Sequence, residues 1–367
     1  MKFTISRENL LEPLQLVCGV VERRQTAPIL SNLLLSAEDG RLTLVGSDQE
    51  VEMTAVIDTV SIMAPGEVTV PARKLMDICR SLPEKAELNA TLEGNRVAVD
   101  SGRFSSHLAT LPVAEFPAIE AGRPEVSLPM KTADLARLLH RVSFAMAQQD
   151  VRYFFNGVLL DLENSRARMV ATNGQRLAMS DVDLGKDAGR HQYIIPRKAV
   201  GELSRVLGAD PEEMISLNFT ANHLVLERGD VRLISKLIDA TYPDYRRAIP
   251  GAGDKVVTAD RQLLKEALTR TAILSNELYR NVRLILVAGR LDMHANNPQQ
   301  EEAEETLAVE YDGADLEIGF NVSYLIEALT VMGGREVRMT LSEPSSACVL
   351  QDLQEPESLY VISPMVL

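Results

Sequence analysis

Cysteine, histidine and long apolar runs are scarce in this sequence of 367 residues, and each scarcity excludes a class of protein. Cys18, Cys79 and Cys348 are scattered, with no CxxC pair and no histidine at ligand spacing, so neither a disulfide framework nor a zinc site is indicated. No apolar stretch approaches the roughly 18 residues that span a bilayer. The N-terminal "MKFTISRENLLEPLQ" lacks the apolar region of a secretory signal. We therefore expect a protein of the reducing cytoplasm, with no membrane partner.

Catalytic motifs are missing as well. The sequence contains no GxGxxG after a strand, no GxxxxGK[ST], no HExxH and no GxSxG. The phosphate-loop lookalike "PGAGDK" (250–255) lacks the spacing and a following serine or threonine. The five histidines stand singly, and the glutamates of 301–305 are too sequential to form one metal cage. We expect no catalytic activity, no cofactor and no metal.

Positive charge is the minority charge, with 38 Lys and Arg against 52 Asp and Glu and a net charge of −14. This balance argues against a protein that coats nucleic acid with its whole surface, but it leaves room for a localised basic face. One short segment gathers such charge: "VPARKLMDICRS" (70–81) carries Arg73, Lys74 and Arg80.

The same phrase occurs three times, which indicates an internal repeat. "IPRKAVGELSRV" (195–206) is again basic, and "FNVSYLIEALTV" (320–331) is not. Pro71, Pro196 and Asn321 are 125 and 125 residues apart. A repeat of this period is the first feature to establish, because it decides the architecture.

Three predicted hairpins recur in step with this phrase. Asn32, Asn156 and Asn281 match at spacings of 124 and 125 residues. Eight residues after each comes a residue that tolerates a positive φ, as a tight turn requires; these are Gly40, Asn164 and Gly289.

Amphipathic helices repeat as well, with Leu10, Leu14 and Val17 forming the stripe of the first. The expected N-caps of the three leading helices are Ser6, Thr132 and Thr258. Each unit reads as helix, hairpin, strands, helix and more strands, an α+β unit. Turn-forming segments place the boundaries of the three domains at 1–125, 126–251 and 252–367.

The basic residues recur at equivalent positions. Arg73 and Arg80 are seven residues apart and share a helix face, and Lys198 and Arg205 match them in the second unit. One interpretation is a solvated helix face with ordinary surface charges. The other is that the units curve with their helices inside, so that the cations line a concave surface that attracts phosphates without reading sequence.

Seven segments resemble the bacterial sliding clamp, the β subunit of DNA polymerase III: "VPARKLMDICR", "FAMAQQDVRYFFNG", "YPDYRRAIP", "TAILSNELYRNVRL", "ANNPQQEEAEE", "EIGFNVSYL" and "YVISPMVL". The resemblance covers essentially the whole chain. It implies three clamp domains, each with two inner helices and outer antiparallel sheets, and two chains closed head-to-tail into a ring around duplex DNA. It also implies a non-catalytic processivity factor of the nucleoid. Its partners would be the polymerase α subunit, the clamp loader, and other polymerases and repair proteins that carry short linear motifs.

The resemblance also implies three sets of site residues. The DNA-binding set is Arg24, Arg73, Lys74, Arg80, Gln149, Tyr153, Arg197, Lys198 and Arg205. The dimer-interface set is Lys74, Arg96, Arg103, Ile273, Leu274, Glu301, Glu302 and Glu305. The peptide-pocket set is Arg152, Phe154, Thr172, Gly174, Gln175, Arg176, Leu177, Pro243, Ala248, Asn321, Tyr324, Val361, Ser363, Pro364 and Met365.

The pocket departs from the family pattern. The usual "ATDGHRLA" reads "ATNGQRLA", and the usual ending "VVMPMRL" reads "VISPMVL", so Ser363 replaces a methionine and Val366 an arginine. Two alternatives stay open. The chain is a divergent or second clamp with altered partner or inhibitor binding, or it is a repeat scaffold that does not encircle DNA.

Overall fold

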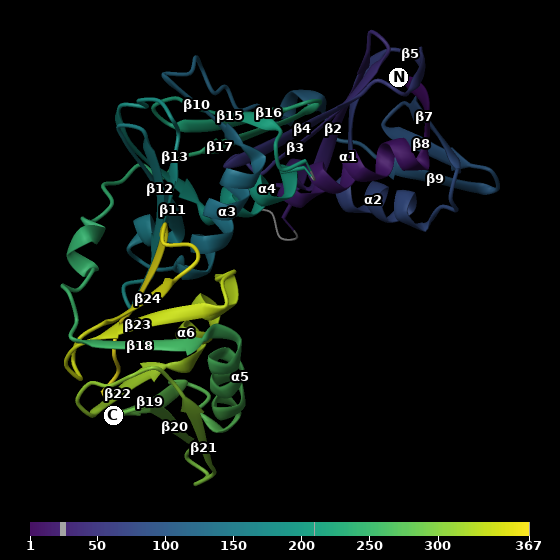
Figure 1. Cartoon of the computed structure of the whole chain (residues 1–367). Coiled ribbons are helices and arrows are strands. Elements are labelled where there is room, and N and C mark those ends of the chain that lie inside the picture. Colours follow the sequence, from purple (N-terminus) through teal and green to yellow (C-terminus); the bar gives the residue numbers. More distant parts are fainter. Residues whose placement is uncertain (23–26, 209, 367) are drawn as a thin grey trace. The chain divides into compact units, whose positions relative to one another are not determined.

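The computed structural model describes residues 1–22, 27–208 and 210–366, and one order of elements occurs three times along the chain (Figure 1). The first run consists of β1 (Lys2–Ser6), α1 (Arg7–Val20), β2 (Asn32–Glu38), β3 (Arg41–Ser47), β4 (Val51–Ile57), β5 (Ser61–Ala64), β6 (Gly66–Pro71), α2 (Ala72–Ser81), β7 (Glu87–Glu93), β8 (Arg96–Ser101) and β9 (Phe104–Ala109).

The later runs have the same order without the extra strand β5. The second consists of β10 (Val126–Lys131), α3 (Thr132–Val142), β11 (Gly157–Glu163), β12 (Arg166–Thr172), β13 (Arg176–Asp183), β14 (Arg190–Pro196), α4 (Arg197–Val206), β15 (Met214–Phe219), β16 (His223–Arg228) and β17 (Val231–Lys236). The third consists of β18 (Lys255–Asp260), α5 (Arg261–Thr271), β19 (Asn281–Val287), β20 (Arg290–Asn296), β21 (Glu302–Ala308), β22 (Leu316–Asn321), α6 (Val322–Val331), β23 (Glu336–Leu341), β24 (Cys348–Asp352) and β25 (Ser358–Ile362).

The threefold repetition confirms the predicted repeat and corrects its details. Each run begins with a strand that the sequence analysis missed. Ser6 caps α1 by accepting from Asn9 N–H, but Thr132 is already inside α3 and Thr258 lies in β18. Asp260 caps α5 instead, because its carboxylate accepts two backbone N–H groups at the point where the helix begins.

The predicted hairpin alignment slips by one residue in the second run, both at its start and at its turn, where Asn164 takes the place of Asp39 and not of Gly40. Gly40, Asn164 and Gly289 all have a positive φ, as predicted. Gly157, however, pairs with Pro196 as Asn32 pairs with Pro71, so Asn156 is not the equivalent of Asn32.

The described residues form two compact units, Met1–Ala133 with Lys198–Leu237, and Asp134–Arg197 with Ile238–Leu367. The first contains a five-stranded sheet, β5-β1-β7-β8-β9, and an eight-stranded sheet, β10-β15-β16-β17-β4-β3-β2-β6. The second contains an eight-stranded sheet, β14-β11-β12-β13-β25-β24-β23-β18, and a four-stranded sheet, β21-β20-β19-β22. Each eight-stranded sheet therefore joins strands of two consecutive runs, through the pairs β17–β4 and β13–β25.

The helices pack onto the sheets through the predicted apolar stripes. Leu10, Leu14 and Val17 of α1 are at most 1% exposed, and each such buried side chain contributes about 1.5–3 kcal/mol to the free energy of unfolding. In the part of the chain that the structure describes, no helix could cross a membrane and no cluster of side chains could hold a metal ion.

A buried carboxyl group fastens the segment that follows the first run, and it gives a testable pH dependence. Glu52 accepts from Ile119 N–H at 3.0 Å, and burial raises the pKa of Glu52. A carboxyl group whose pKa is raised in the folded state stabilises the fold in its protonated form. Its contribution is therefore present at low pH and is lost as the pH rises through the folded-state pKa. Glu52→Gln keeps an acceptor without the charge, so we expect about 1 kcal/mol of added stability at pH 8 in urea denaturation and a smaller gain at pH 4.5. The exposed neighbour Glu50→Gln is the control, and identical gains at both pH values would contradict this account.

Candidate functional site

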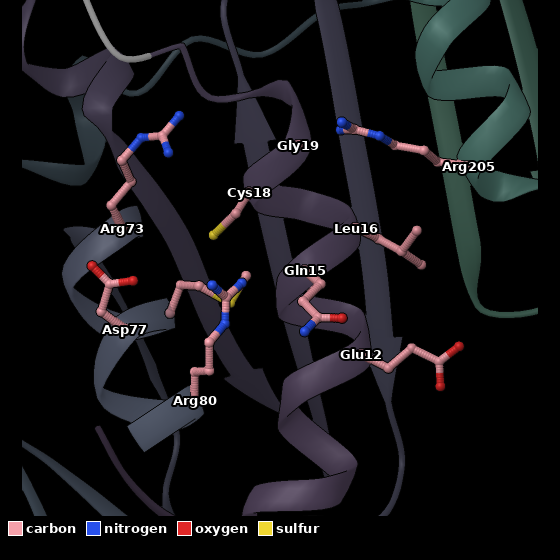
Figure 2. Close-up of a pocket in the computed structure, with 10 residues that line it drawn as sticks. Glu12, Gln15, Leu16, Cys18, Gly19, Arg73, Asp77, Arg80 and Arg205 are labelled. Carbon is pink, nitrogen blue, oxygen red and sulfur yellow. The ribbon is translucent and has the colours of Figure 1, made fainter. Parts of the chain in front are cut away.

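Three of the predicted DNA-binding cations converge on one cavity of about 590 Å³ in the first unit (Figure 2). Arg73 and Arg80 come from α2, and Arg205 comes from α4. Arg73 donates to Val21 O at 3.1 Å, which holds its guanidinium at the cavity wall. Burial raises the pKa of the Cys18 thiol in the same wall to about 12, so this thiol stays protonated. The cavity presents three cations together with the carboxylates of Glu12 and Asp77, and its thiol is not a reactive nucleophile.

A glycine permits this arrangement. A Cβ atom on Gly19 would lie 2.4 Å from a guanidinium nitrogen of Arg205, so any larger residue would displace that side chain. Arg205 is also bonded to the buried carboxylate of Glu202 at 3.0 Å. Gly19 therefore leaves room for this arginine at the rim, and the pairing with Glu202 holds its guanidinium there.

Two other predicted cations are occupied inside the chain. Lys198 donates to Val20 O at 2.7 Å and to Glu22 at 3.0 Å, and it also pairs with Asp48. Arg197 donates to two backbone carbonyls, those of Met146 and Ala147. Both cations therefore have partners within the chain, and their role in DNA binding stays a prediction.

The three remaining residues of this set that the structure describes are accessible. Lys74 and Gln149 are exposed, and Tyr153 is 57% exposed. Arg24 lies outside the described residues.

The cavity gives a prediction for DNA affinity. Arg80→Ala removes one exposed cation, so we expect affinity for any duplex sequence to fall and the slope of log K against log salt to decrease by about 1. Arg41→Ala, an exposed arginine of β3 that pairs with Asp58, is the matched control and should leave the slope unchanged. An effect that depended on DNA sequence would argue against phosphate contact.

The turn between β12 and β13 organises the predicted peptide site in the second unit. Asn173 Oδ1 accepts from the backbone N–H groups of Gln175 and Arg176 at 2.9 and 3.0 Å. Thr172 Oγ1 accepts from Gly174 N–H at 3.0 Å. Gly174 has φ +90°, a conformation that favours glycine. The turn is thus closed by its own side chains.

Arg176 joins this turn to α6. Its guanidinium lies over the rings of Tyr324 and Phe144, at 4.4 and 5.1 Å from their centroids. It also pairs with Glu327 and donates to the carbonyl of Phe144. Only 10% of the Arg176 side chain is exposed, so this cation holds elements of two runs together.

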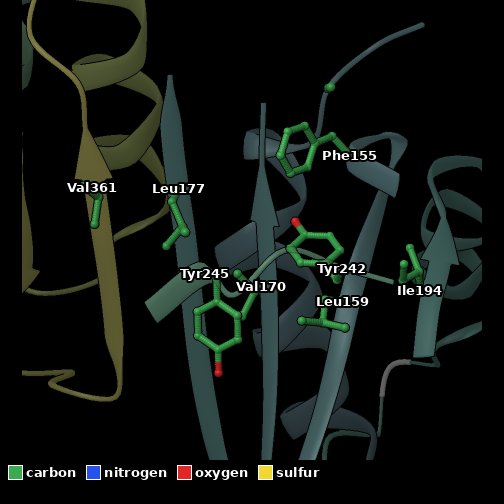
Figure 3. Packing of buried hydrophobic residues seen from close by; sticks show 9 residues of the cluster. Phe155, Leu159, Val170, Leu177, Ile194, Tyr242, Tyr245 and Val361 are labelled. Carbon is green, nitrogen blue, oxygen red and sulfur yellow. The ribbon is translucent and has the colours of Figure 1, made fainter. Parts of the chain in front are cut away.

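A cluster of buried apolar side chains lies beside the turn (Figure 3). Leu177 of β13 is paired with Val361 of β25. Phe155 and Tyr242 are packed edge to face with centroids 5.9 Å apart, and Phe154 packs against the same cluster. The cluster is a packed apolar core next to the polar turn, and Phe154 is one of the partly buried side chains at its edge.

The segment that carries Pro243 and Ala248 is fastened to the sheet by a polar network. Tyr245, within a 3-10 helix (Tyr245–Ala248), donates to Asp161 at 2.8 Å and accepts from Arg168 at 3.1 Å. The network fixes the two exposed pocket residues of this segment relative to β11 and β12.

The C-terminal residues return to the same place. Ser363 N–H donates to Gln175 O at 2.8 Å, and Met365 N–H donates to Gly319 O at 2.8 Å. Asn321 caps α6 by accepting from Ser323 N–H at 3.0 Å. Most of the predicted pocket set is therefore connected through the turn, α6 and the C-terminal segment.

The predicted interface residues lie on several elements, and of the strands that carry them only β21 ends its sheet. Ile273, in the 3-10 helix Ala272–Leu274, is 74% exposed, and Arg96 and Arg103 are exposed on β8 and its turn. Glu305 of β21 already pairs with Arg270, which lowers the pKa of that carboxyl group.

Four residues of the peptide site were missed by the sequence analysis: Phe144, Asp161, Tyr245 and Glu327. Each acts through a partner distant in sequence. Phe144 and Tyr245 stood inside segments that carried the resemblance, and no local signal identifies Asp161 and Glu327.

The repeated strand–helix units joined into shared sheets, with cations between α1 and α2, define the class of DNA clamps. Residues 1–120, 129–244 and 246–366 match the N-terminal, central and C-terminal domains of the DNA polymerase III beta subunit. The chain belongs to this family.

Relatives cover the full length. The chain is 49% identical over 366 residues to a beta sliding clamp of Pseudomonas putida and 46% identical over 365 residues to that of Escherichia coli, with 100% of each chain covered. A crystal structure of the Pseudomonas aeruginosa sliding clamp bound to griselimycin matches with a TM-score of 0.94 and 49% identity, again over 100% of both chains.

Proposed function

We propose that this protein is a sliding clamp, a non-catalytic processivity subunit that encircles duplex DNA and tethers a DNA polymerase. The observation that carries the proposal is full-length membership of the DNA polymerase III beta subunit family. In this proposal the domains are 1–125, 126–251 and 252–367. The protein acts on nucleoid DNA in the cytoplasm.

The repeated topology supports a ring made of two copies. In the described residues, β17 pairs with β4 and β25 pairs with β13 at the two junctions between runs. By position in the repeat, β9 is the equivalent of β17 and β25, and β21 is the equivalent of β4 and β13. Both β9 and β21 end their sheets. A third junction of the same kind therefore joins β9 of one copy to β21 of another, and two copies close head-to-tail.

The register of this third junction follows from the other two. Leu233 is opposite Met53, and Tyr360 is opposite Ala178. In each run, the strand pairings can be followed residue by residue from the first strand to the last. They place Ser106 of β9 at the same position as Leu233 of β17 and Tyr360 of β25. The pairings that follow the hairpin turn of each run place Ala303 of β21 at the same position as Met53 of β4 and Ala178 of β13.

The charges agree with that register. Ser106 opposite Ala303 of the second copy brings Arg103 beside Glu304 and Glu305. Opposite charges on paired strands stabilise a sheet junction and like charges oppose it. A scaffold that does not form rings would not need this match.

Tethering requires a site for partner peptides, and we place it at the turn of β12 and β13 and the apolar cluster beside it. In the proposal the partners are the polymerase α subunit, the clamp loader and other proteins with short linear motifs. A divergent clamp with shifted preferences stays the alternative, favoured by Ser363 in place of a family methionine.

Retention on circular DNA tests the function. After loading by an ATP-driven clamp loader, we expect the protein to stay on nicked circular plasmid through gel filtration and to leave once the plasmid is linearised. Equal retention on both forms would indicate ordinary binding, and no retention on either would favour the scaffold alternative.

A further inference from the structure

Two arginines that the repeat makes equivalent differ in their surroundings. Arg205 of α4 follows Arg80 of α2 by 125 residues, and Glu202 follows Asp77 by the same 125. In both helices the acid and the arginine have the i, i+3 spacing that places two side chains on one face. The sequence alone therefore gives both arginines the same role.

The pair on α2 is not bonded. Asp77 and Arg80 are exposed, and in the part of the chain that the structure describes neither the Asp77 carboxylate nor the Arg80 guanidinium has an ion-pair partner. Both side chains stand at the cavity between α1 and α2 (Figure 2). The Arg80 guanidinium is therefore available to a phosphate.

The pair on α4 is bonded and partly buried. Glu202 is 5% exposed, and both of its carboxylate oxygens accept from Nη1 of Arg205, at 3.0 and 3.3 Å. The pair lies against Gly19 of α1, where a Cβ atom would be 2.8 Å from the carboxylate. A buried carboxylate is costly without a counter-ion, so Glu202 retains Arg205 although the arginine side chain is 57% exposed.

The other charges around Glu202 do not replace Arg205. Lys198 lies one turn earlier on α4, but its ammonium group is already bonded to a backbone carbonyl and to two carboxylates, those of Glu22 and Asp48. The remaining charged side chains of the cavity wall are Glu12 of α1 and Arg73, Asp77 and Arg80 of α2. Arg205 is thus the cation that neutralises Glu202.

We propose that Glu202 is an internal counter-ion that keeps Arg205 from binding DNA, so that the backbone phosphates contact Arg80 and not its equivalent on α4. The inference rests on the proposed DNA-encircling function and goes further, by assigning a role to a buried carboxylate beside the cations. One ionic contact fewer weakens the hold on DNA, which suits a protein that moves along the duplex. Loss of the Glu202 charge releases Arg205 and strengthens that hold.

Acidification is one way to remove this charge. Burial raises the pKa of Glu202, although the positive charges of Arg205 and Lys198 oppose the shift. The carboxyl group therefore binds a proton at a higher pH than an exposed glutamate does. Arg205 is released as the pH falls through that raised pKa.

The slope of log K against log salt counts the phosphate contacts. In fluorescence anisotropy with the full-length protein and a labelled duplex at pH 8, Glu202→Gln should steepen the slope by about 1, because one more phosphate is neutralised. Between about 50 and 200 mM salt, its affinity should fall about 3- to 4-fold more than that of the wild-type protein. Arg205→Ala should leave the wild-type slope unchanged, and the double variant should return to it.

Two comparisons separate this role from general charge and from stability. Asp77→Asn removes the equivalent carboxylate of α2, which holds no arginine, so its slope should stay at the wild-type value. From pH 8 to pH 5, the slope of the wild-type protein should steepen by about 1 more than that of Glu202→Gln. The pH series of the wild-type protein gives this result even where a substitution weakens the fold.

The outcomes are distinct. A slope that decreases by about 1 in Arg205→Ala would mean that Arg205 already binds a phosphate, and an unchanged slope in Glu202→Gln would mean that no cation is released. Either result overturns the inference and leaves the proposed function intact. Failure of the wild-type protein to stay on circular plasmid after loading overturns the proposed function and this inference together.

Discussion

Replacing Ile273 with aspartate is expected to convert the protein from a dimer to a monomer. The Ile273 side chain is 74% exposed in the single chain. In the proposed dimer it is covered at the junction between β9 of one copy and β21 of the other. A closed ring has two junctions, so the loss of about 1.5–3 kcal/mol of burial at each counts twice. The dissociation constant should rise by about 10² to 10⁴, as measured by analytical ultracentrifugation.

The control is another exposed apolar residue of the same unit. Leu278 is 79% exposed and lies outside the proposed junction, so Leu278→Asp should leave the dimer intact. If both variants dissociated equally, general surface charge would explain the result. If Ile273→Asp stayed dimeric, the assignment of this residue to the junction would be wrong.

Removing Arg176 is expected to cost both stability and peptide binding. The side chain is stacked between Phe144 and Tyr324 and paired with Glu327. Arg176→Ala leaves two rings without their cation and a half-buried carboxylate without its partner, so unfolding should become easier by about 2–3 kcal/mol. Peptide affinity should fall at least tenfold, because Tyr324 loses the group that orients it.

Arg166→Ala gives the comparison, since Arg166 has a 62% exposed side chain and lies 3.6 Å from Asp181. An exposed ion pair of this kind contributes about 0–1 kcal/mol to the free energy of unfolding. Urea denaturation measures the loss of stability, and fluorescence anisotropy with one labelled partner peptide measures the loss of affinity. Equal losses in the two variants would show that Arg176 has no special role between the runs.

The repeat was predictable from sequence because its signals are local. The stripe of Leu10, Leu14 and Val17 follows from helical periodicity, and the positive φ of Gly40 and Gly289 follows from turn chemistry. The leading strands were not predictable in this way. β1 has only five residues, and its pairing partner β7 lies about 85 positions away, so its stability comes from a non-local contact.

The candidate sites show the same limit of prediction from local sequence. The cations of α2 repeat along the sequence, but the pairing of Lys198 with Asp48 is a tertiary contact that no local pattern predicts. The proposed peptide site depends on the pairing of β13 with β25, which brings Gln175 beside Ser363. Only the family resemblance could place such distant residues together.

Covalent closure of the ring tests the central claim most directly. In the proposed register, Ser106 of one copy faces Ala303 of the other, at a separation that suits a disulfide. We predict that the double variant Ser106→Cys with Ala303→Cys, oxidised after loading onto nicked circular plasmid, stays linked to the circle through detergent and high salt until the plasmid is linearised. Release of the oxidised protein from the intact circle, or the formation of open polymers in place of closed dimers, would contradict a ring that joins β9 to β21.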